Sequence, residues 1–299
     1  MTTFTFATRK SALALAQSRA FARHLIDENP GLDVAELHIT TSGDRFQDQR
    51  LQDIGGKGLF IKELEEALLD GRADFAVHSI KDVPGELWPG LHIACTPERE
   101  DPRDVLVTKS GGKLADLPSG AVVGTSSLRR SVCLLDVRPD LRIEPLRGNV
   151  DTRLKKVAEG PYEAIVLAFA GLKRLGLAFR ASHVLDPSEC LPAVGQGALG
   201  IECKEGNAAV EGALRAVDHR ETAIAVSAER AFMKRVGGNC RMPIAAYATR
   251  AGSDLHLRAF VADPDGTNRR RGERRIGWPS TRDEARLVGD DLAEELTHQ

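Results

Sequence analysis

The stretch TFTFATRKSALALAQSRAFARHLI, residues 3–26, decides the fold. Its first part, Phe4 to Ala7, is a short β-prone run, and an apolar-periodic stretch typical of a helix follows from Ser11 to Ile26. A second β-prone run lies at Glu36 to Thr40. The order strand, helix, strand predicts a βαβ unit and therefore an α/β domain.

The same alternation continues along the chain. Residues 61–69 predict a helix that ends at Gly71, and residues 74–78 predict the next strand. A second α/β unit follows, with strands expected at 121–124, 142–144 and 164–167 and helices expected from Ser127 and Asn149.

Two segments rich in helix breakers, 96–103 and 191–197, interrupt this alternation and suit crossings between two hinged lobes. From about Asp218 the pattern changes to a helix, three β-like runs around Ile244, Leu257 and Arg274, and a closing helix from Thr281. We therefore predict an α/β fold with lobe 1 at 1–97 and 198–217, lobe 2 at 103–191, and a small α+β C-terminal domain at 218–299.

Composition excludes several classes of function. The 299 residues carry 41 Lys+Arg against 43 Asp+Glu, so a net charge of -2 provides no general field for nucleic acid. The five cysteines are odd in number and contain no C-x-x-C pair, which argues against a disulfide framework and a zinc site. No signal peptide or membrane span is predicted, and we expect a cytoplasmic protein.

Cationic side chains recur where predicted strands give way to helices. Free backbone N–H groups at a helix start favour an anion, and Arg is the side chain that binds carboxylates through two parallel hydrogen bonds. For any single junction, N-capping by Ser with solvent-exposed arginines is the commoner explanation. Several junctions in two lobes instead suggest a polyanionic ligand; their residues are Arg9, Ser11, Ser127, Arg129, Arg130, Arg147, Arg153 and Arg174.

The segment His78-Ser-Ile-Lys-Asp-Val-Pro84 places Lys81 and Asp82 in a loop after an apolar strand. Ligands of open α/β sheets bind at such carboxyl ends of strands, although two adjacent charges can also form a simple surface ion pair. We interpret His78 as a structural hydrogen-bonding residue.

Two other loops are candidates for function. Gly55-Gly-Lys-Gly-Leu-Phe60 lacks the spacing of a phosphate-binding P-loop and is interpreted as a flap, or an ordinary turn, whose Lys57 and Phe60 could reach a ligand. Cys240, in Val236-Gly-Gly-Asn-Cys-Arg-Met-Pro243, is the candidate reactive thiol, although no neighbouring His forms a dyad with it. The run 269–275 is arginine-rich but has no aromatic stacking platform, so we interpret it as a solvated hairpin.

Together these segments resemble the porphobilinogen deaminase family, also called hydroxymethylbilane synthase, over essentially the whole chain. The matching motifs stand in the order and spacing of the family at 7–11, 55–60, 78–84, 98–104, 124–130, 146–150, 191–197 and around Cys240. The resemblance implies two lobes like a hinged periplasmic binding protein and a small third domain.

The resemblance also implies an activity. The family is a transferase of haem and other tetrapyrrole biosynthesis, and it joins four porphobilinogen molecules head to tail with loss of ammonia and releases hydroxymethylbilane. Its cofactor is a dipyrromethane, attached here through a thioether to Cys240. Asp82 matches the catalytic carboxylate.

The remaining matches are binding residues for carboxylates of cofactor and substrate. By resemblance the cofactor is held by Lys81, Ser127, Arg129, Arg130, Arg147 and Arg153, and the substrate by Arg9, Ser11, Arg174, Lys57, Phe60 and Gln196. One position departs from the family, because Asn239 stands before the cysteine where a glycine is usual. Asn tolerates a left-handed backbone better than most residues, so we expect the loop to be retained.

Two other interpretations of the function fit this sequence pattern. A non-catalytic two-lobed protein that binds a polycarboxylate would need the arginines but no reactive thiol and no Lys81–Asp82 pair. A thiol-dependent transferase without a pyrrole cofactor is a third possibility. Besides the substrate porphobilinogen we expect no nucleic-acid, membrane or metal partner, and we expect a monomer.

Overall fold

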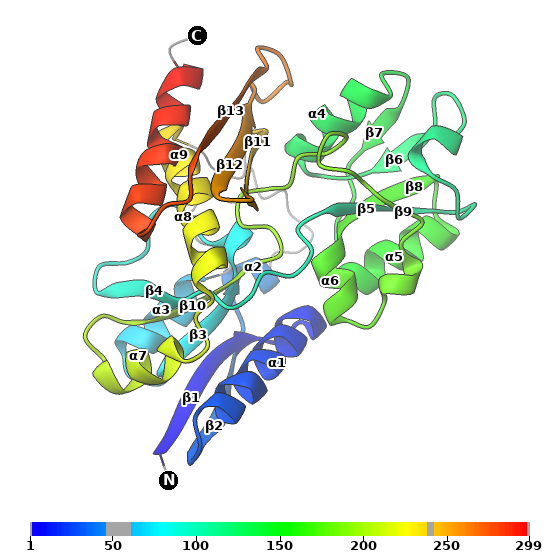
Figure 1. Cartoon of the computed structure of the whole chain (residues 1–299). Coiled ribbons are helices and arrows are strands. Elements are labelled where there is room, and N and C mark those ends of the chain that lie inside the picture. The colour runs from blue at the N-terminus through cyan, green and yellow to red at the C-terminus, as the bar shows by residue number, and fades with distance from the viewer. Residues whose placement is uncertain (1, 46–60, 238–241, 298–299) are drawn as a thin grey trace. The chain divides into compact units, whose positions relative to one another are not determined.

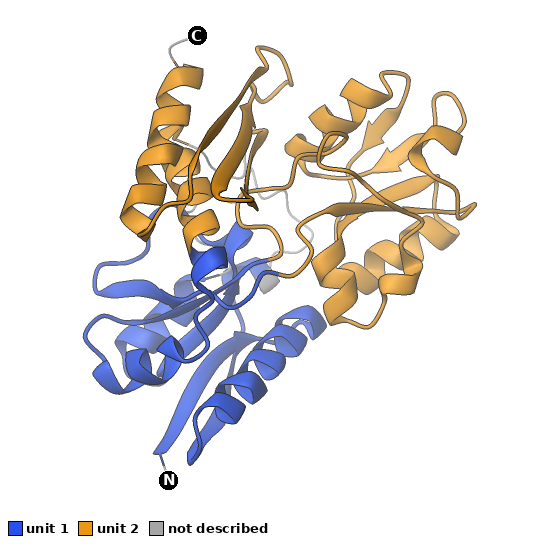
Figure 2. Ribbon diagram, viewed as in Figure 1, with its two compact units in different colours: residues 1–99, 198–223 blue, residues 100–197, 224–299 orange. Residues whose placement is uncertain are grey.

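The computed structural model describes residues 2–45, 61–237 and 242–297 (Figure 1). It contains two compact units, shown in Figure 2: unit 1 is residues 1–99 with 198–223, and unit 2 is residues 100–197 with 224–299. The chain therefore passes between units at 99–100, 197–198 and 223–224. The first passage lies within the breaker segment 96–103, and the second directly follows 191–197.

Unit 1 is built on a five-stranded sheet of order β2-β1-β3-β10-β4. Strand β1 is parallel to β2 and β3, whereas β10 is antiparallel to both of its neighbours. The strands are β1 (Thr2–Arg9), β2 (Leu32–Ile39), β3 (Phe75–Ser79), β4 (Leu91–Cys95) and β10 (Leu199–Lys204). The helices are α1 (Ala12–Glu28), α2 (Ser42–Arg45), α3 (Lys62–Leu69) and α7 (Ala208–Arg215), with a 3-10 turn η1 (Ile80–Asp82).

The alternating side chains of β1 explain why this sheet is covered on both faces. Phe4 and Phe6 pack on the side of α1 and α7, whereas Ala7 packs with Leu64 and Leu68 of α3. Phe75 of β3 completes the aromatic core, stacked at 5.9 Å from Phe6. Burial of these rings on folding is the main force that holds β1, β3 and α1 together.

Unit 2 contains a second five-stranded sheet of order β7-β6-β8-β5-β9. Strand β6 is parallel to β7 and β8, and β5 is antiparallel to β8 and β9. The strands are β5 (Asp104–Thr108), β6 (Val122–Gly124), β7 (Arg142–Glu144), β8 (Ala164–Ala168) and β9 (His183–Val184). The helices are α4 (Leu128–Val137), α5 (Val150–Glu159) and α6 (Phe169–Arg174), with 3-10 turns η2 (Leu114–Asp116) and η3 (Ala178–Arg180).

A three-stranded antiparallel sheet, β11-β12-β13, forms the other part of unit 2. Its strands are β11 (Ile244–Ala251), β12 (Asp254–Val261) and β13 (Arg270–Gly277). Its helices are α9 (Arg282–Thr297) and α8 (Arg220–Arg235), and the first four residues of α8 belong to unit 1. Gly289 of α9 lies so close to α8 that an added Cβ would be 2.1 Å from the Ala228 carbonyl oxygen. Phe260 and Ala245 belong to the core of the neighbouring five-stranded sheet, so the two sheets of unit 2 share buried surface.

The predicted fold class is confirmed: two α/β sheets and a small α+β part are present. Predicted strands and helices lie within a few residues of the observed ones, and residues 198–203 do return to the sheet of unit 1 as β10. The hinge and the division into three domains stay predictions. Every helix of the described ranges is too short or too polar to span a lipid bilayer.

Candidate functional site

In unit 1, Asp82, the predicted catalytic residue, and Lys81, a predicted cofactor-binding residue, lie at the carboxyl end of β3. Lys81 and Asp82 belong to η1, which follows the buried residues 75–78 of β3. Ile80 and Val83, on either side of the pair, are 1% and 2% exposed, and the Ile80 N–H donates to the Ala198 carbonyl at 3.1 Å. Asp82 itself is exposed. Its carboxylate therefore projects from a turn that the buried residues on both sides hold in place.

The strand opposite contributes to the position of that turn. Gly200 of β10 packs against Ile80, and a Cβ at this position would lie 2.4 Å from the Ile80 Cδ1 atom. A larger residue would displace Ile80 and with it the backbone that carries Asp82. Glycine at position 200 is therefore needed to keep the turn that carries Asp82 in place.

His78 forms a buried pair with Glu202, with 2.9 Å between His78 Nε2 and Glu202 Oε2. Both side chains are inaccessible, at 4% and 0% exposure, so they couple β3 to β10 beneath the Lys81–Asp82 turn. This agrees with the expected structural role of His78.

The end of β1 lies at the same edge of the sheet, because β1 and β3 are parallel neighbours. Arg9 is the last residue of β1, and Ser11 caps α1 by accepting a hydrogen bond from the Ala14 N–H at 3.3 Å. Gln17 of α1 donates to Ser79 Oγ at 3.1 Å, which ties the helix to the end of β3. Unit 1 thus brings Arg9, Ser11, Lys81 and Asp82 to one edge.

Unit 2 repeats this arrangement with three junctions. Strands β7, β6 and β8 are parallel neighbours, and the helices α5, α4 and α6 begin just after their carboxyl ends. The loops after β6 and β7 are tied together, since Ser126 Oγ donates to the Leu146 carbonyl at 3.0 Å and accepts from its N–H at 3.1 Å. The predicted cofactor residues of this unit, at 127, 129, 130, 147 and 153, therefore belong to one sheet edge.

The two adjacent arginines of α4 are buried around a single carboxylate. Asp104, fully buried at the start of β5, lies 2.7 Å from Arg129 Nη1 through one oxygen and 2.7 Å from Arg130 Nη2 through the other. Gln196 Nε2 also donates to Asp104 at 3.1 Å and to the Pro102 carbonyl at 2.6 Å.

Electrostatics decide the ionisation state of this buried group. Burial would raise the pKa of Asp104, but the charges of Arg129 and Arg130 outweigh it and hold the pKa well below its usual range. The carboxylate is therefore ionised, and two guanidinium groups against one carboxylate leave the cluster with one excess positive charge. Arg129 also donates to the Leu191 carbonyl, and Arg130 to the Val166 carbonyl, so both are held rigidly.

Arg147 and Arg153 flank a turn that requires glycine. Gly148 has a φ of +111°, and a Cβ there would lie 2.7 Å from Thr152. Arg153 Nε donates to the Gly148 carbonyl at 2.8 Å, which fixes the first turn of α5. Arg147, partly exposed, stands just before this turn.

Arg174, in the last turn of α6, anchors the crossing segments. Its Nη2 donates to the Gly197 carbonyl at 2.6 Å. Burial lowers the pKa of Arg174 to about 10, against the opposing charge of Glu100. Gly197, with a φ of +87°, could not accept a side chain because its Cβ would lie 2.3 Å from the Glu100 carbonyl oxygen.

Three predicted site residues, Lys57, Phe60 and Cys240, lie outside the described residues, as does Asn239. Conversely, sequence reasoning assigned no role to Asp104 or Glu202. Each is an acidic residue directly beside apolar strand residues, and that is the signal by which both could have been noticed.

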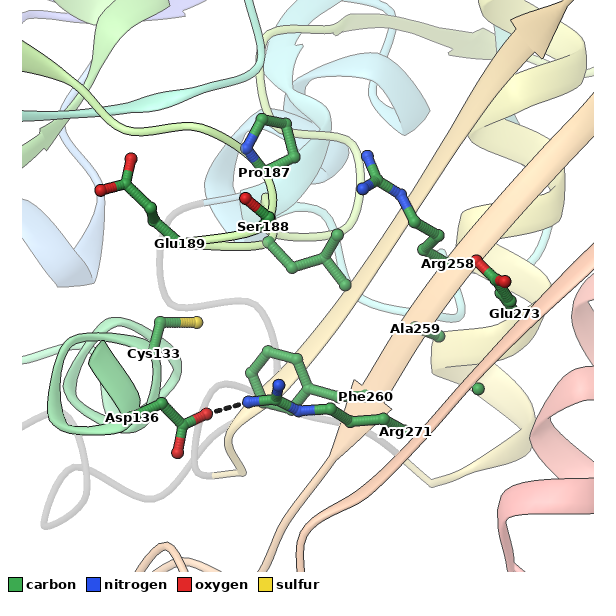
Figure 3. A pocket seen from close by; sticks show the side chains of 12 residues that line it. Cys133, Asp136, Pro187, Ser188, Glu189, Arg258, Ala259, Phe260, Arg271 and Glu273 are labelled. Carbon is green, nitrogen blue, oxygen red and sulfur yellow. Dashed lines mark hydrogen bonds and ion pairs between the residues drawn. The ribbon is translucent and has the colours of Figure 1, made fainter.

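A cavity of about 320 Å³ lies elsewhere in unit 2, between α4, the 187–191 segment and the three-stranded sheet (Figure 3). Cys133, Ser188 and Phe260 line it, and Asp136 at its rim pairs with Arg269 and Arg271. No predicted site residue among those described contributes to this cavity.

Comparison with known proteins identifies the family. Residues 4–212 match the family model described as porphobilinogen deaminase, dipyromethane cofactor binding domain, and residues 223–298 match the porphobilinogen deaminase C-terminal domain. A porphobilinogen deaminase of Sorangium cellulosum is 63% identical over 99% of this chain and 98% of its own length. Those of Albidiferax ferrireducens and Bordetella parapertussis are 56% and 51% identical, over 89% and 98% of this chain and 84% and 92% of their own lengths. This chain therefore belongs to the porphobilinogen deaminase family.

Proposed function

We propose that this chain joins four porphobilinogen molecules head to tail into hydroxymethylbilane, with loss of one ammonia for each unit, on a covalent dipyrromethane primer. The observation that carries the proposal is the near-complete match to the family, including its dipyrromethane-binding domain over residues 4–212. Relatives named as deaminases give no support to the alternative of a non-catalytic binding protein.

The residues of unit 2 fit a dipyrromethane. Each pyrrole of this group carries two carboxylates, so a dipyrromethane brings four. The buried cluster around Asp104 has one excess positive charge, and the N-termini of α4 and α5 lie at the same sheet edge. We propose that Ser127, Arg129, Arg130, Arg147 and Arg153, with Lys81 of unit 1, hold the carboxylates, and that Cys240 forms the thioether.

Within that set we propose two different roles for the arginines. Arg129 and Arg130 are 5% and 7% exposed and already bound to Asp104, so we propose that they act mainly through their charge and by fixing the loop after β6. Arg147 is more exposed and stands beside the rigid turn at Gly148, which suits direct contact with a carboxylate.

When bound, the dipyrromethane supplies the pyrrole carbon that receives the first substrate unit. We propose that Asp82 accepts the pyrrole N–H of the reacting porphobilinogen. As ammonia departs, positive charge develops on that pyrrole, and a fixed carboxylate stabilises this charge more than it stabilises the neutral substrate. The anchored turn of residues 80–83, which exposes only Asp82, suits this role because the carboxylate does not need to reorganise.

The substrate's own carboxylates require further cations. We propose that Arg9, Ser11 and Arg174, together with Lys57 and Phe60, bind porphobilinogen. Arg9 and Ser11 lie at the sheet edge that carries Asp82, which supports the first part of this assignment. Gln196 is 1% exposed and bonded to Asp104, so we propose that it positions the loop rather than contacting substrate.

Two further properties are proposed with the activity. The net charge of -2 supports an enzyme that does not depend on nucleic acid, and we propose that it acts as a monomer in the cytoplasm. Light scattering of the purified protein at several concentrations should give the mass of one chain, and the mass of a dimer would refute the monomer.

Intact mass spectrometry combined with an ammonia-release assay tests the function. The wild-type protein should carry the mass of a dipyrromethane and release ammonia from porphobilinogen. Cys240→Ser should remain folded at its unmodified mass, while the matched Cys95→Ser keeps the adduct. An adduct that persists in Cys240→Ser would overturn the attachment site. A wild-type protein with neither adduct nor ammonia release would overturn the function.

A further inference from the structure

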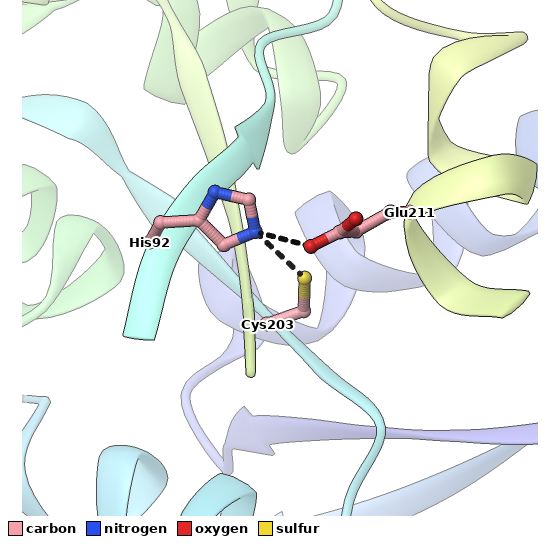
Figure 4. Close-up of side chains that lie close together, drawn as sticks. All are labelled: His92, Cys203 and Glu211. Carbon is pink, nitrogen blue, oxygen red and sulfur yellow. Dashed lines mark hydrogen bonds and ion pairs between the residues drawn. The ribbon is translucent and has the colours of Figure 1, made fainter. Parts of the chain in front are cut away.

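Three side chains that the proposed function does not use meet at one place in unit 1 (Figure 4). They are His92 of β4, Cys203 of β10 and Glu211 of α7. One ligand atom from each lies within 4.8 Å of the others. These three elements are separated in sequence, so no short spacing motif in the sequence indicates the cluster.

The sheet register explains why the cluster forms. His92 and Cys203 are direct cross-strand partners in the β4–β10 ladder, which places both side chains on the same face. Helix α7 packs on that face through Val210 and Leu214 and carries Glu211 with it. The backbone N–H of Gly206 donates to Glu211 Oε1 at 3.1 Å, which orients the carboxylate.

One hydrogen on His92 Nε2 cannot serve both of its neighbours. The same imidazole nitrogen, His92 Nε2, lies 3.1 Å from Glu211 Oε1 and 3.5 Å from Cys203 Sγ. If Nε2 carries a hydrogen, it cannot point along both directions at once. If Nε2 is unprotonated, its lone pair faces the carboxylate oxygen. A cation placed between the three atoms would satisfy all of them.

Two of the three distances between the ligand atoms fit a tetrahedral metal ion. With metal bonds of about 2.0–2.1 Å to nitrogen and oxygen and about 2.3 Å to sulfur, tetrahedral ligands should be about 3.3 Å apart for N and O and about 3.5 Å apart for N and S. The two observed distances from His92 Nε2, 3.1 and 3.5 Å, are close to these values.

We propose that His92, Cys203 and Glu211 bind one Zn²⁺ ion, with a water molecule as the fourth ligand. Nitrogen, sulfur and oxygen ligands together suit Zn²⁺ better than Mg²⁺ or Ca²⁺, which prefer oxygen alone. Cys203 is buried, whereas the side chains of His92 and Glu211 are 38% and 25% exposed, which leaves room for water on the outer side. On binding, the Cys203 thiol loses its proton to solvent and the sulfur forms the bond to the metal.

The site has a structural role in this proposal. In the β3–β10 ladder, Leu199 pairs with Ser79 next to the Lys81–Asp82 turn, whereas Cys203 pairs with Phe75 at the opposite end. The metal would therefore join β4, β10 and α7 at a distance from the chemistry. Zn²⁺ should raise the melting temperature of the holoenzyme through mass action and leave ammonia release unchanged.

The experiment uses the holoenzyme after removal of metals by a chelator. Titration with Co²⁺ should give a saturable thiolate-to-cobalt absorption band at one equivalent, and Zn²⁺ should abolish the band. Zinc calorimetry in buffers of different ionisation enthalpy should show release of one proton. Cys203→Ala should lose the band, while Cys95→Ala, which removes the buried cysteine of the same sheet, should retain it.

Two further variants keep the test decisive if Cys203→Ala fails to fold. Glu211→Gln, at a partly exposed position, should weaken Zn²⁺ affinity by at least the roughly 10- to 100-fold that loss of even an outer ligand partner costs. His256→Gln removes a similar His–Glu pair of unit 2, with 2.7 Å between its atoms, and should change nothing. The proposal fails if the wild type shows no band, if Cys203→Ala keeps it, or if Glu211→Gln binds Zn²⁺ like the wild type.

Discussion

Two aspartates, one in each unit, allow the proposed catalytic turn to be compared with a buried structural cluster. Asp82 follows a buried strand of unit 1 and is exposed, whereas Asp104 begins a buried strand of unit 2 and is fully covered. Asp104 is neutralised by Arg129 and Arg130, while Asp82 stands on a turn held by its neighbours' backbone and side chains. The residue type is the same, and burial together with partners decides its role.

The largest expected effect is on stability, from Asp104→Asn. This change leaves two buried guanidinium groups without their carboxylate, and breaking a buried ion pair in this way costs about 3–5 kcal/mol. Denaturant unfolding of the variant should show this loss, and cofactor loading should fall with it. A loss below about 1 kcal/mol would mean that water reaches the arginines and compensates them.

The next effect is on rate, from Asp82→Asn. The variant keeps the size of the side chain but loses its charge, so single-turnover ammonia release by protein with preformed cofactor should fall by about 100-fold or more. Because Asp82 is exposed, the free energy of unfolding should change by less than about 0.5 kcal/mol. Asp82→Glu is the matched control and should retain weak activity. A wild-type rate in Asp82→Asn would contradict the catalytic role and leave Asp82 as a surface ion pair with Lys81.

Arg147 and Arg130 allow a similar comparison between a partly exposed residue and a buried one. Arg147→Lys removes the planar guanidinium beside the Gly148 turn, and loss of a charge-assisted hydrogen bond costs about 1.5–3 kcal/mol. The fraction of chains that carry cofactor, measured by intact mass, should fall while the melting temperature holds. Arg130→Lys should instead lower the melting temperature, because Arg130 bonds Asp104 and the Val166 carbonyl. If Arg147→Lys and Arg130→Lys changed cofactor loading and melting temperature equally, they would contradict the proposal that Arg147 contacts a carboxylate and Arg130 supports the loop.

The smallest expected effect is on the pH dependence of stability. The pKa of Asp104 lies well below its unfolded value of about 4. Its contribution is therefore complete above about pH 4 and is lost as the pH falls toward the folded pKa, at no more than about 1.4 kcal/mol for each pH unit. Unfolding free energies measured from pH 5 to pH 2.5 should fall less steeply in Asp104→Asn. Equal slopes would show that other carboxylates dominate acid unfolding.

Sequence patterns predicted many of the elements and the loop that carries Asp82, because these depend on neighbouring residues, but they did not predict β4, β5 or β9. The bounds predicted for β7 are those observed, and the place of Asp82 after an apolar strand indicated a ligand-binding loop, whereas its catalytic role came from the family resemblance. The buried cluster around Arg130 was not predictable in this way. Its carboxylate, Asp104, lies on β5, and Gln196, which donates to that carboxylate, lies on a crossing segment, so only the folded sheet brings them together.

The position of β10 bears on how the chain folds during synthesis. Strand β10 lies between β3 and β4, but it is made more than a hundred residues after them, so the sheet of unit 1 is incomplete until residue 204 has emerged. At about 5–20 residues per second, the facing edges of β3 and β4 wait for several seconds before they gain their partner. Unpaired strand edges of this kind are templates for aggregation. Ribosome-bound chains that end between residues 100 and 198 should therefore depend on chaperones more than chains that include β10.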